Sequence, residues 1–247
     1  MSTILVTGAT GTLGRPLVQQ LRRTNHHIHT LSRHPASLAD TAHPVDLRNG
    51  SGLDHALHGV NTIVHCASTP TGGDIGSATH LIRAARAADV SHLVYISIVG
   101  TDQIPLAYYR TKHTVEEALL ASGLGVTILR TTQFHTLVRS ICARLALAPA
   151  MPYPDIDVQP IDPAEVALRL TRLAQEEPAG RVPDLGGPQV EPFHDLARAY
   201  LDTTHTRRLL WPLHLPGPTF AAYRSGAHLA PDRAVGRTTF AQHLART

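Results

Sequence analysis

The sequence predicts an α/β fold in which helices cover both faces of a parallel sheet. Residues 3–7 form a short run of β-forming side chains, and apolar residues at helical spacing follow it directly. This alternation recurs through residues 1–130 and is typical of right-handed βαβ units. The chain has 247 residues, 43% of them hydrophobic, which is enough to bury one core. We therefore expect a single doubly wound domain of the Rossmann type, with a core over residues 1–130 and a smaller portion over residues 131–247.

Three glycines follow the first strand at three-residue spacing. Gly8 allows a sharp turn, Gly11 lets backbone N–H groups approach a pyrophosphate, and Gly14 lets the next helix pack closely. That helix presents free N–H groups and the positive end of its dipole to a phosphate. A structural βα turn without a ligand is the alternative. The position between a strand and an amphipathic helix favours a dinucleotide site. The residues predicted to bind the dinucleotide here are Gly8, Thr10, Gly11, Thr12, Leu13 and Gly14.

Ser32 and Arg33 follow a second expected strand, at residues 27–31. The end of this strand is where a doubly wound fold meets the adenosine ribose of a dinucleotide. An acidic residue there would bind a free 2′-hydroxyl, whereas a hydroxyl and a guanidinium suit a 2′-phosphate. The pair therefore favours NADP(H) over NAD(H), with an ordinary surface pair as the alternative.

Further strands and helices alternate up to residue 130. In order, they are a strand at Val45–Asp46, a helix at 53–57, a strand at 61–66, a helix from Asp74, a strand at 93–98, a helix at 108–122 and a strand at 126–130. Ala67 and Ser68 follow the strand at 61–66, beside the expected path of the cofactor. With Cys66 they are predicted cofactor-binding residues, and Cys66 is interpreted as a small core residue rather than a nucleophile.

The alternation loosens in the C-terminal portion. We expect helices at 134–147, 163–173, 193–200 and 240–245, and a late strand at 182–185. The segment 203–239 is rich in Pro, His and Arg, and its pattern predicts no particular structure.

Composition excludes several classes of protein. The formal charge is only +3 and no dense Lys/Arg run occurs, so we expect no nucleic-acid partner. Two cysteines are too few for a disulfide framework, and no long apolar stretch or leader is seen, so we expect a cytoplasmic protein without a membrane contact. The 17 histidines lack the spacing of a metal-ligand set, so no metal site is predicted.

Lys112 is the only lysine of the chain and lies four residues after Tyr108. This spacing puts both side chains on one face of a helix. An incidental pair is the alternative, and it is weakened because arginine otherwise replaces lysine throughout the sequence.

The whole chain resembles the atypical short-chain dehydrogenases/reductases of the NmrA-like, NAD(P)-binding group. The motifs that carry the resemblance are TGATGTLG, the Ser32–Arg33 pair, VYISIVG, YYRTK, ILRTTQFH, VQPIDPAEVA and LGGP. It implies that Tyr108 exchanges a proton with the substrate oxygen. It implies that Lys112 binds the nicotinamide ribose and lowers the pKa of the tyrosine. Asp46, with Leu47 beside it, would contact the adenine.

The resemblance also implies two further catalytic positions. Asp74 matches an Asn that holds a water for proton relay. Ser97 lies near the family's active-site serine, although alignment with extended members places that hydroxyl nearer Ile98. Ser97 is therefore either catalytic or structural.

The substrate is expected at the carboxyl edge of the sheet. The candidate contacts are Gln133, Phe134, His135, Tyr153 and Trp211. The sequence thus predicts an NADP(H)-dependent oxidoreductase, a monomer or homodimer, that reduces a carbonyl of a small organic molecule. Two alternatives remain: a non-catalytic NADP(H)-binding regulator, and an epimerase, dehydratase or isomerase on the same scaffold.

Overall fold

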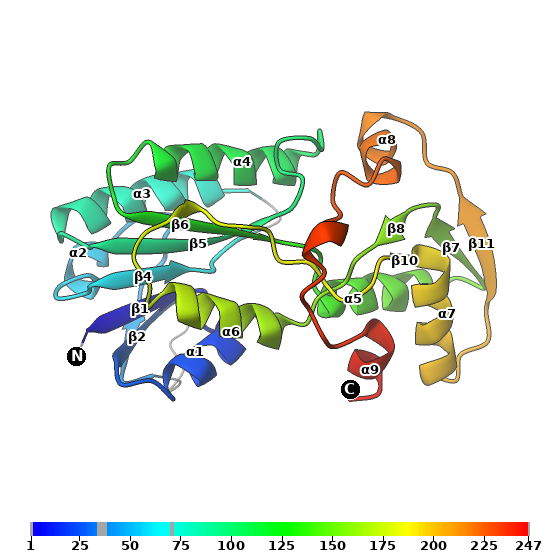
Figure 1. The fold of residues 1–247 in the computed structure, drawn as a ribbon, viewed down its shortest axis with the longest axis horizontal. Helices are drawn as coiled ribbons and strands as arrows, with labels where there is room; N and C mark the ends of the chain where they lie inside the picture. The colour runs from blue at the N-terminus through cyan, green and yellow to red at the C-terminus, as the bar shows by residue number, and fades with distance from the viewer. Residues whose placement is uncertain (1, 34–38, 70–71, 247) are drawn as a thin grey trace. The chain divides into compact units, whose positions relative to one another are not determined.

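The computed structural model describes residues 2–33, 39–69 and 72–246 (Figure 1). Its internal contacts divide the chain into two compact units. The first comprises Met1–Ser97, Arg110–Leu129 and Val166–Val182, and the second comprises Ile98–Tyr109, Arg130–Glu165 and Pro183–Thr247. Residues 166–182, which the sequence groups with the C-terminal portion, thus belong to the first unit.

The first unit is built on a seven-stranded sheet with the order β3-β2-β1-β4-β5-β6-β9. Its strands are β1 (Thr3–Thr7), β2 (His27–Ser32), β3 (Thr41–Pro44), β4 (Thr62–His65), β5 (His92–Ile98), β6 (Val126–Thr131) and β9 (Gly180–Arg181). The pairings of β1 with β2 and β4, of β2 with β3, of β4 with β5 and of β6 with β9 are parallel. The doubly wound α/β prediction is confirmed.

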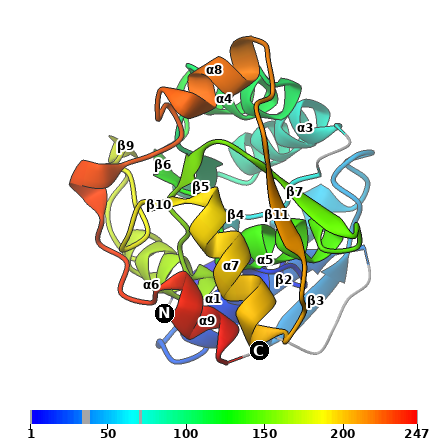
Figure 2. The same cartoon turned by 90° about the vertical axis from the view of Figure 1, so that its right-hand side faces the viewer.

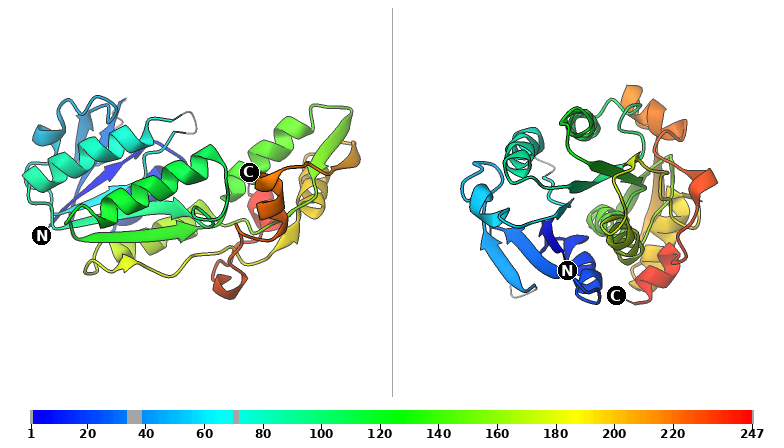
Figure 3. Two further views of the ribbon diagram at one scale, coloured as in Figure 1. Left: turned by 90° about the horizontal axis from the view of Figure 1, so that it is seen from above. Right: turned by 60° about the vertical axis from the view of Figure 1, so that its left-hand side comes forward.

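Helices cover both faces of this sheet, with α3 and α4 on one face and α1 and α6 on the other (Figures 1 and 3). The helices are α1 (Gly14–Leu21), α2 (Leu53–Ala56), α3 (Asp74–Ala87), α4 (Ala107–Leu120) and α6 (Pro163–Leu173). The main core cluster joins strand residues such as Leu5 and Ile63 to Leu81 of α3 and Val115 of α4, all buried. This packing fixes the carboxyl ends of the strands, where ligands bind in such folds.

Two predicted strands have other bounds in the structure. β3 ends at Pro44, although the backbone N–H of Val45 is still donated to the Ser32 carbonyl oxygen of β2 at 3.3 Å. Asp46 then closes a turn, because its carboxylate accepts the backbone N–H of Arg48 at 3.0 Å.

The late strand β9 is Gly180–Arg181. The predicted segment still follows β6, because the backbone N–H groups of Val182 and Leu185 are donated to the carbonyl oxygens of Ile128 and Arg130 at 3.1 and 2.9 Å, and Pro183, which has no N–H, interrupts the ladder between them.

The second unit has two small sheets, in which β8 pairs antiparallel with β10 and β7 pairs parallel with β11 (Figure 2). Its strands are β7 (Ala150–Pro154), β8 (Asp157–Val158), β10 (Glu191–Pro192) and β11 (Leu209–Leu213). Its helices are α5 (His135–Leu145), α7 (Phe193–Thr203), α8 (Pro218–Arg224), the 3-10 turn η1 (Pro231–Arg233) and α9 (Phe240–Leu244). Side chains of α5, α7, α9 and β7 form its core. β11 and α8 occupy the segment for which the sequence predicted no structure.

No helix in the described ranges is both long enough and apolar enough to span a bilayer.

Candidate functional site

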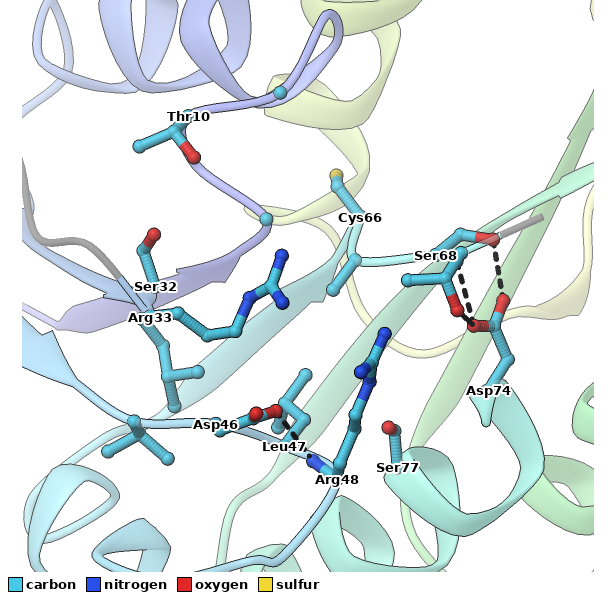
Figure 4. Close-up of a pocket in the computed structure, with 16 residues that line it drawn as sticks. Thr10, Ser32, Arg33, Asp46, Leu47, Arg48, Cys66, Ser68, Asp74 and Ser77 are labelled. Atoms are coloured by element: carbon cyan, nitrogen blue, oxygen red, sulfur yellow. Dashed lines mark hydrogen bonds between the residues drawn. The ribbon is translucent and has the colours of Figure 1, made fainter. Parts of the chain in front are cut away.

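The carboxyl ends of β1, β2 and β4 in the first unit surround a cavity of about 310 Å³ (Figure 4). Its lining includes eleven of the predicted site residues: Gly8, Thr10, Gly11, Ser32, Arg33, Asp46, Leu47, Cys66, Ala67, Ser68 and Asp74. Thr12, Leu13, Gly14 and Lys112 are not among the residues that line it. The elements that the sequence predicted to bind a dinucleotide therefore meet around one cavity.

The three glycines of the turn have different structural reasons. Gly8 has φ +68°, and a Cβ there would lie 2.8 Å from the Ala67 nitrogen. A Cβ on Gly14 would overlap the Gly8 carbonyl oxygen. A Cβ on Gly11 would meet only that oxygen, at 3.2 Å. The fold thus requires Gly8 and Gly14, whereas the bare backbone of Gly11 leaves room for a group in the cavity.

Asp74, at the first position of α3, is held by the loop after β4. Its carboxylate accepts hydrogen bonds from the Ser68 hydroxyl at 2.5 Å and from the Thr69 backbone N–H at 2.8 Å (Figure 4). Asp74 is 7% exposed and lines the cavity. Asp74 therefore orders the cavity wall through Ser68 and Thr69.

Two arginines point into the cavity, Arg33 after β2 and Arg48 after Asp46 (Figure 4). Within the described ranges, neither guanidinium forms an ion pair or a hydrogen bond. Guanidiniums that face a cavity without a partner attract an anion, and the planar fork of arginine suits a phosphate. Sequence reasoning missed Arg48, whose only signal is its place two residues after Asp46.

Lys112 is buried on α4, with 3% of its surface exposed. Its ammonium lies 3.3 Å from the Ile96 carbonyl oxygen and 4.8 Å from the centre of the Tyr95 ring. Burial lowers the pKa of Lys112 to about 8, against the opposing pull of Asp74, Cys66 and Glu116. A buried ammonium with a lowered pKa disfavours folding, and such groups cluster at functional sites.

The cost of burying Lys112 can be measured. Below about pH 8 the Lys112 amine is protonated in both the folded and the unfolded state, so the folded state bears the whole free-energy cost of burying the charge. At higher pH the folded state loses it first. The free energy of unfolding should therefore rise with pH, by roughly 2–3 kcal/mol relative to Lys112→Met, up to about pH 10. Urea titrations of both proteins test this, and parallel pH profiles would contradict it.

His65, which sequence reasoning missed, fixes the carboxyl end of β4. Its Nδ1 lies 2.7 Å from the Thr7 hydroxyl oxygen, which also accepts the Ala67 backbone N–H at 3.2 Å. The ring stacks on Tyr95 with centroids 5.4 Å apart. Burial first, and then Lys112, lower the pKa of His65 to about 3, so the imidazole stays neutral. Its signal in the sequence is only that of a buried strand residue.

Two other groups have little capacity for chemistry. Burial raises the pKa of the Cys66 thiol to about 12, so it stays protonated. Ser97 is 1% exposed, and its hydroxyl has no hydrogen-bond partner in the described part of the chain. Both observations favour structural roles.

Tyr108 lies in the first turn of α4, and Lys112 follows one turn later. Tyr108 is partly exposed, whereas its neighbour Tyr109 is 5% exposed. Burial raises the pKa of Tyr109, and so do the charge of Tyr223 and its hydrogen bond to that tyrosine. Tyr108 is thus the one of the two tyrosines that can reach solvent or a small molecule.

The predicted substrate contacts all lie in the second unit and are scattered. Phe134 caps α5, and His135 is fully buried, with Nε2 2.9 Å from the Thr238 carbonyl oxygen. Gln133 is partly exposed, and its Oε1 is buried without a partner among the described residues. Tyr153 lines a second cavity, of about 320 Å³. Trp211 is 64% exposed on β11 and lines neither cavity.

In the ranges that the structure covers, no three His, Cys, Asp or Glu side chains are grouped so as to hold a metal ion.

Comparison with known proteins gives a family and named relatives. The model of the family described as NAD(P)H-binding matches residues 8–147. A curated reductase of (4-alkanoyl-5-oxo-2,5-dihydrofuran-3-yl)methyl phosphate from Streptomyces griseus is 30% identical over 196 residues, which is 75% of this chain and 68% of the relative. Quinone oxidoreductase 2 of Escherichia coli is 32% identical over 135 residues, 51% of this chain and less than half, 47%, of the relative.

A solved structure has the same fold over nearly the whole chain. It is an NADPH-dependent quinone oxidoreductase from Escherichia coli complexed with NADPH, with a TM-score of 0.84 and 21% sequence identity. The alignment covers 98% of this chain and 99% of that one.

Proposed function

We propose that the chain, which belongs to the NAD(P)H-binding family, is an NADPH-dependent reductase of the atypical short-chain dehydrogenase type. Its substrate would be a carbonyl group of a small organic molecule. The observation that carries the proposal is the cavity of the first unit, which is lined by a glycine turn and by two arginines whose guanidiniums have no partner in the described ranges. The names of both relatives, a reductase and an oxidoreductase, support the reaction type.

The residues around the cavity fit a dinucleotide. The N-terminus of α1 offers backbone N–H groups to the pyrophosphate. Gly11, whose own N–H is donated to the Gly8 carbonyl oxygen at 3.0 Å, lets the pyrophosphate approach because it has no side chain. Ser32, Arg33 and Arg48 offer a hydroxyl and two guanidiniums to the 2′-phosphate. Asp46 and Leu47 form the wall expected beside the adenine. The cofactor, when bound, supplies the hydride.

Tyr108 and Lys112 would handle the proton. The Tyr108 hydroxyl donates it to the substrate oxygen as the hydride arrives at the carbonyl carbon. The positive charge of Lys112, one helical turn away, stabilises the tyrosinate that remains after the proton is donated. The Lys112 ammonium would also donate a hydrogen bond to the nicotinamide ribose, which a compact donor suits.

The test is NADPH oxidation by the wild type against a panel of small carbonyl compounds. The panel begins with quinones and oxo-dihydrofurans, because the two relatives are named for such compounds, and continues with aldehydes and ketones. We expect at least one class to be reduced. If NADPH binds but none is reduced, the chain is a cofactor-binding regulator and the enzymatic proposal fails.

The two arginines should set the cofactor preference. We expect NADPH to bind at least about tenfold, or ~1.4 kcal/mol, more tightly than NADH. Arg33→Ala and Arg48→Ala should each reduce this ratio and leave NADH affinity nearly unchanged, because only NADPH carries the 2′-phosphate. Arg83→Ala removes an exposed charge of α3 that does not line the cavity, and it should change neither affinity. Fluorescence titration measures both, and equal affinities in the wild type would contradict the assignment.

A further inference from the structure

The two-stranded sheet of the second unit exposes an apolar face. The strand register pairs Leu209 with Ala150, Trp211 with Pro152 and Leu213 with Pro154. Residues two apart on a strand share a face, so these six apolar side chains lie on one side of the sheet. Leu209 is 78%, Trp211 64% and Leu213 41% exposed.

Most of the opposite face of the same sheet is covered. Met151 is fully buried, and Leu210 and Tyr153 pack against the core cluster that contains residues of α7, while Pro212 is exposed. Figures 1 and 2 show α7 along one side of β7 and β11. On the outer face the β11 side chains are exposed, whereas Ala150, Pro152 and Pro154 of β7 are partly exposed. A contiguous apolar face with an exposed tryptophan is typical of an interaction site rather than of free surface.

Charges of opposite sign mark the two ends of this face. The exposed Arg207 lies two residues before Leu209, at the amino end of β11. Asp155 follows Pro154 at the carboxyl end of β7. Its side chain is 68% exposed and lies 3.7 Å from the ring of His214, which follows Leu213 and is also exposed. Because β7 and β11 run parallel, Arg207 lies at one end of the face, and Asp155 with His214 lies at the other.

We infer that this face binds the same face of a second copy of the chain, with the strands of the two copies antiparallel. The two copies would be related by a two-fold axis that lies in the plane of the interface and perpendicular to the strands. This axis places the apolar residue pairs of one copy against those of the other, with the pair of Trp211 and Pro152 at the centre. The same axis brings Arg207 of one copy to the end of the face that holds Asp155 of the partner subunit, beside His214 of the partner subunit. A face of this kind is complementary to itself, whereas an anionic lipid surface would be repelled by its acidic end.

Contact through the face is favoured over pairing along the strand edge. Pro212 removes a backbone donor from β11, and proline on an edge strand hinders the addition of another strand. The patch holds few large side chains, with Trp211 as its central anchor. The dimer should therefore be in equilibrium with the monomer at micromolar concentrations, as is usual for small interfaces.

Trp211 provides a direct readout because it is the only tryptophan of the chain. We expect its emission maximum to shift to shorter wavelength as the protein concentration rises, over the same range in which sedimentation shows the mass doubling. Trp211→Ser should abolish the mass change, and folding should be preserved because the side chain is exposed. Leu120→Ser removes a leucine that is 54% exposed on α4 and should leave the dimer intact.

A charge exchange tests the antiparallel arrangement. Arg207→Asp and Asp155→Arg should each weaken the dimer about tenfold, because each creates two like-charge contacts. The double variant restores opposite charges and should restore the dimer. The inference is overturned if the wild type stays monomeric, if Trp211→Ser still dimerises, or if the double variant does not recover. Sedimentation of the monomer with anionic vesicles in place of self-association would also overturn it.

Discussion

Tyr108→Phe is expected to lower turnover by about 10²–10⁴-fold, the usual contribution of general acid catalysis. The substitution removes one hydroxyl and keeps the ring, so the first turn of α4 should pack as before. NADPH affinity should barely change, because the arginines and the glycine turn that would hold the cofactor are untouched.

The adjacent tyrosine provides the matched control. Tyr109→Phe removes a hydroxyl that is buried and bonded to Tyr223, so it should lower the unfolding free energy by about 1 kcal/mol. Turnover should stay near the wild-type value. Steady-state kinetics on any substrate found in the panel compare the two variants. Full activity in Tyr108→Phe would refute the assigned proton donor and leave the cofactor site unaffected.

Gly11→Val is expected to lower the affinity for NADPH at least about 100-fold, which is a loss of ~2.7 kcal/mol of binding free energy. The branched side chain would occupy the space that Gly11 leaves open at the cavity. The fold should survive, because the nearest atom to an added Cβ is the Gly8 carbonyl oxygen at 3.2 Å.

Gly14→Ala separates the loss of binding from the loss of structure. A Cβ on Gly14 would overlap the Gly8 carbonyl oxygen, so this smaller change should lower the melting temperature. Circular dichroism and NADPH titration of both variants distinguish the two effects. A Gly11→Val protein that binds NADPH normally would show that the phosphate site lies elsewhere.

The sequence predicted the parts of the site that depend on local pattern. The turn at Gly8 and Gly14 has a signature because nearby backbone leaves no room for a side chain. The alternation of strands and helices is likewise local, since each apolar run has its own period. Eleven of the residues predicted from such patterns or from the family resemblance line one cavity.

Other features depend on contacts between distant residues, and the sequence does not carry them. Arg48 lines the cavity from the turn that the Asp46 carboxylate closes after β3. β11 forms by pairing with β7, about sixty residues earlier in the chain, and the apolar run at 209–213 gave no period by which to place it.

The division of the chain into two units has a consequence for biosynthesis. All segments of the first unit have left the ribosome once Val182 is exposed, so its core can form while translation continues. The second unit must wait, because His135 bonds to Thr238, 103 residues later, and Phe240 and Leu244 belong to its core. During this interval the apolar side chains of α5 lack their final neighbours. A nascent chain stalled before residue 238 should therefore hold a protease-resistant first unit beside a segment that recruits chaperones.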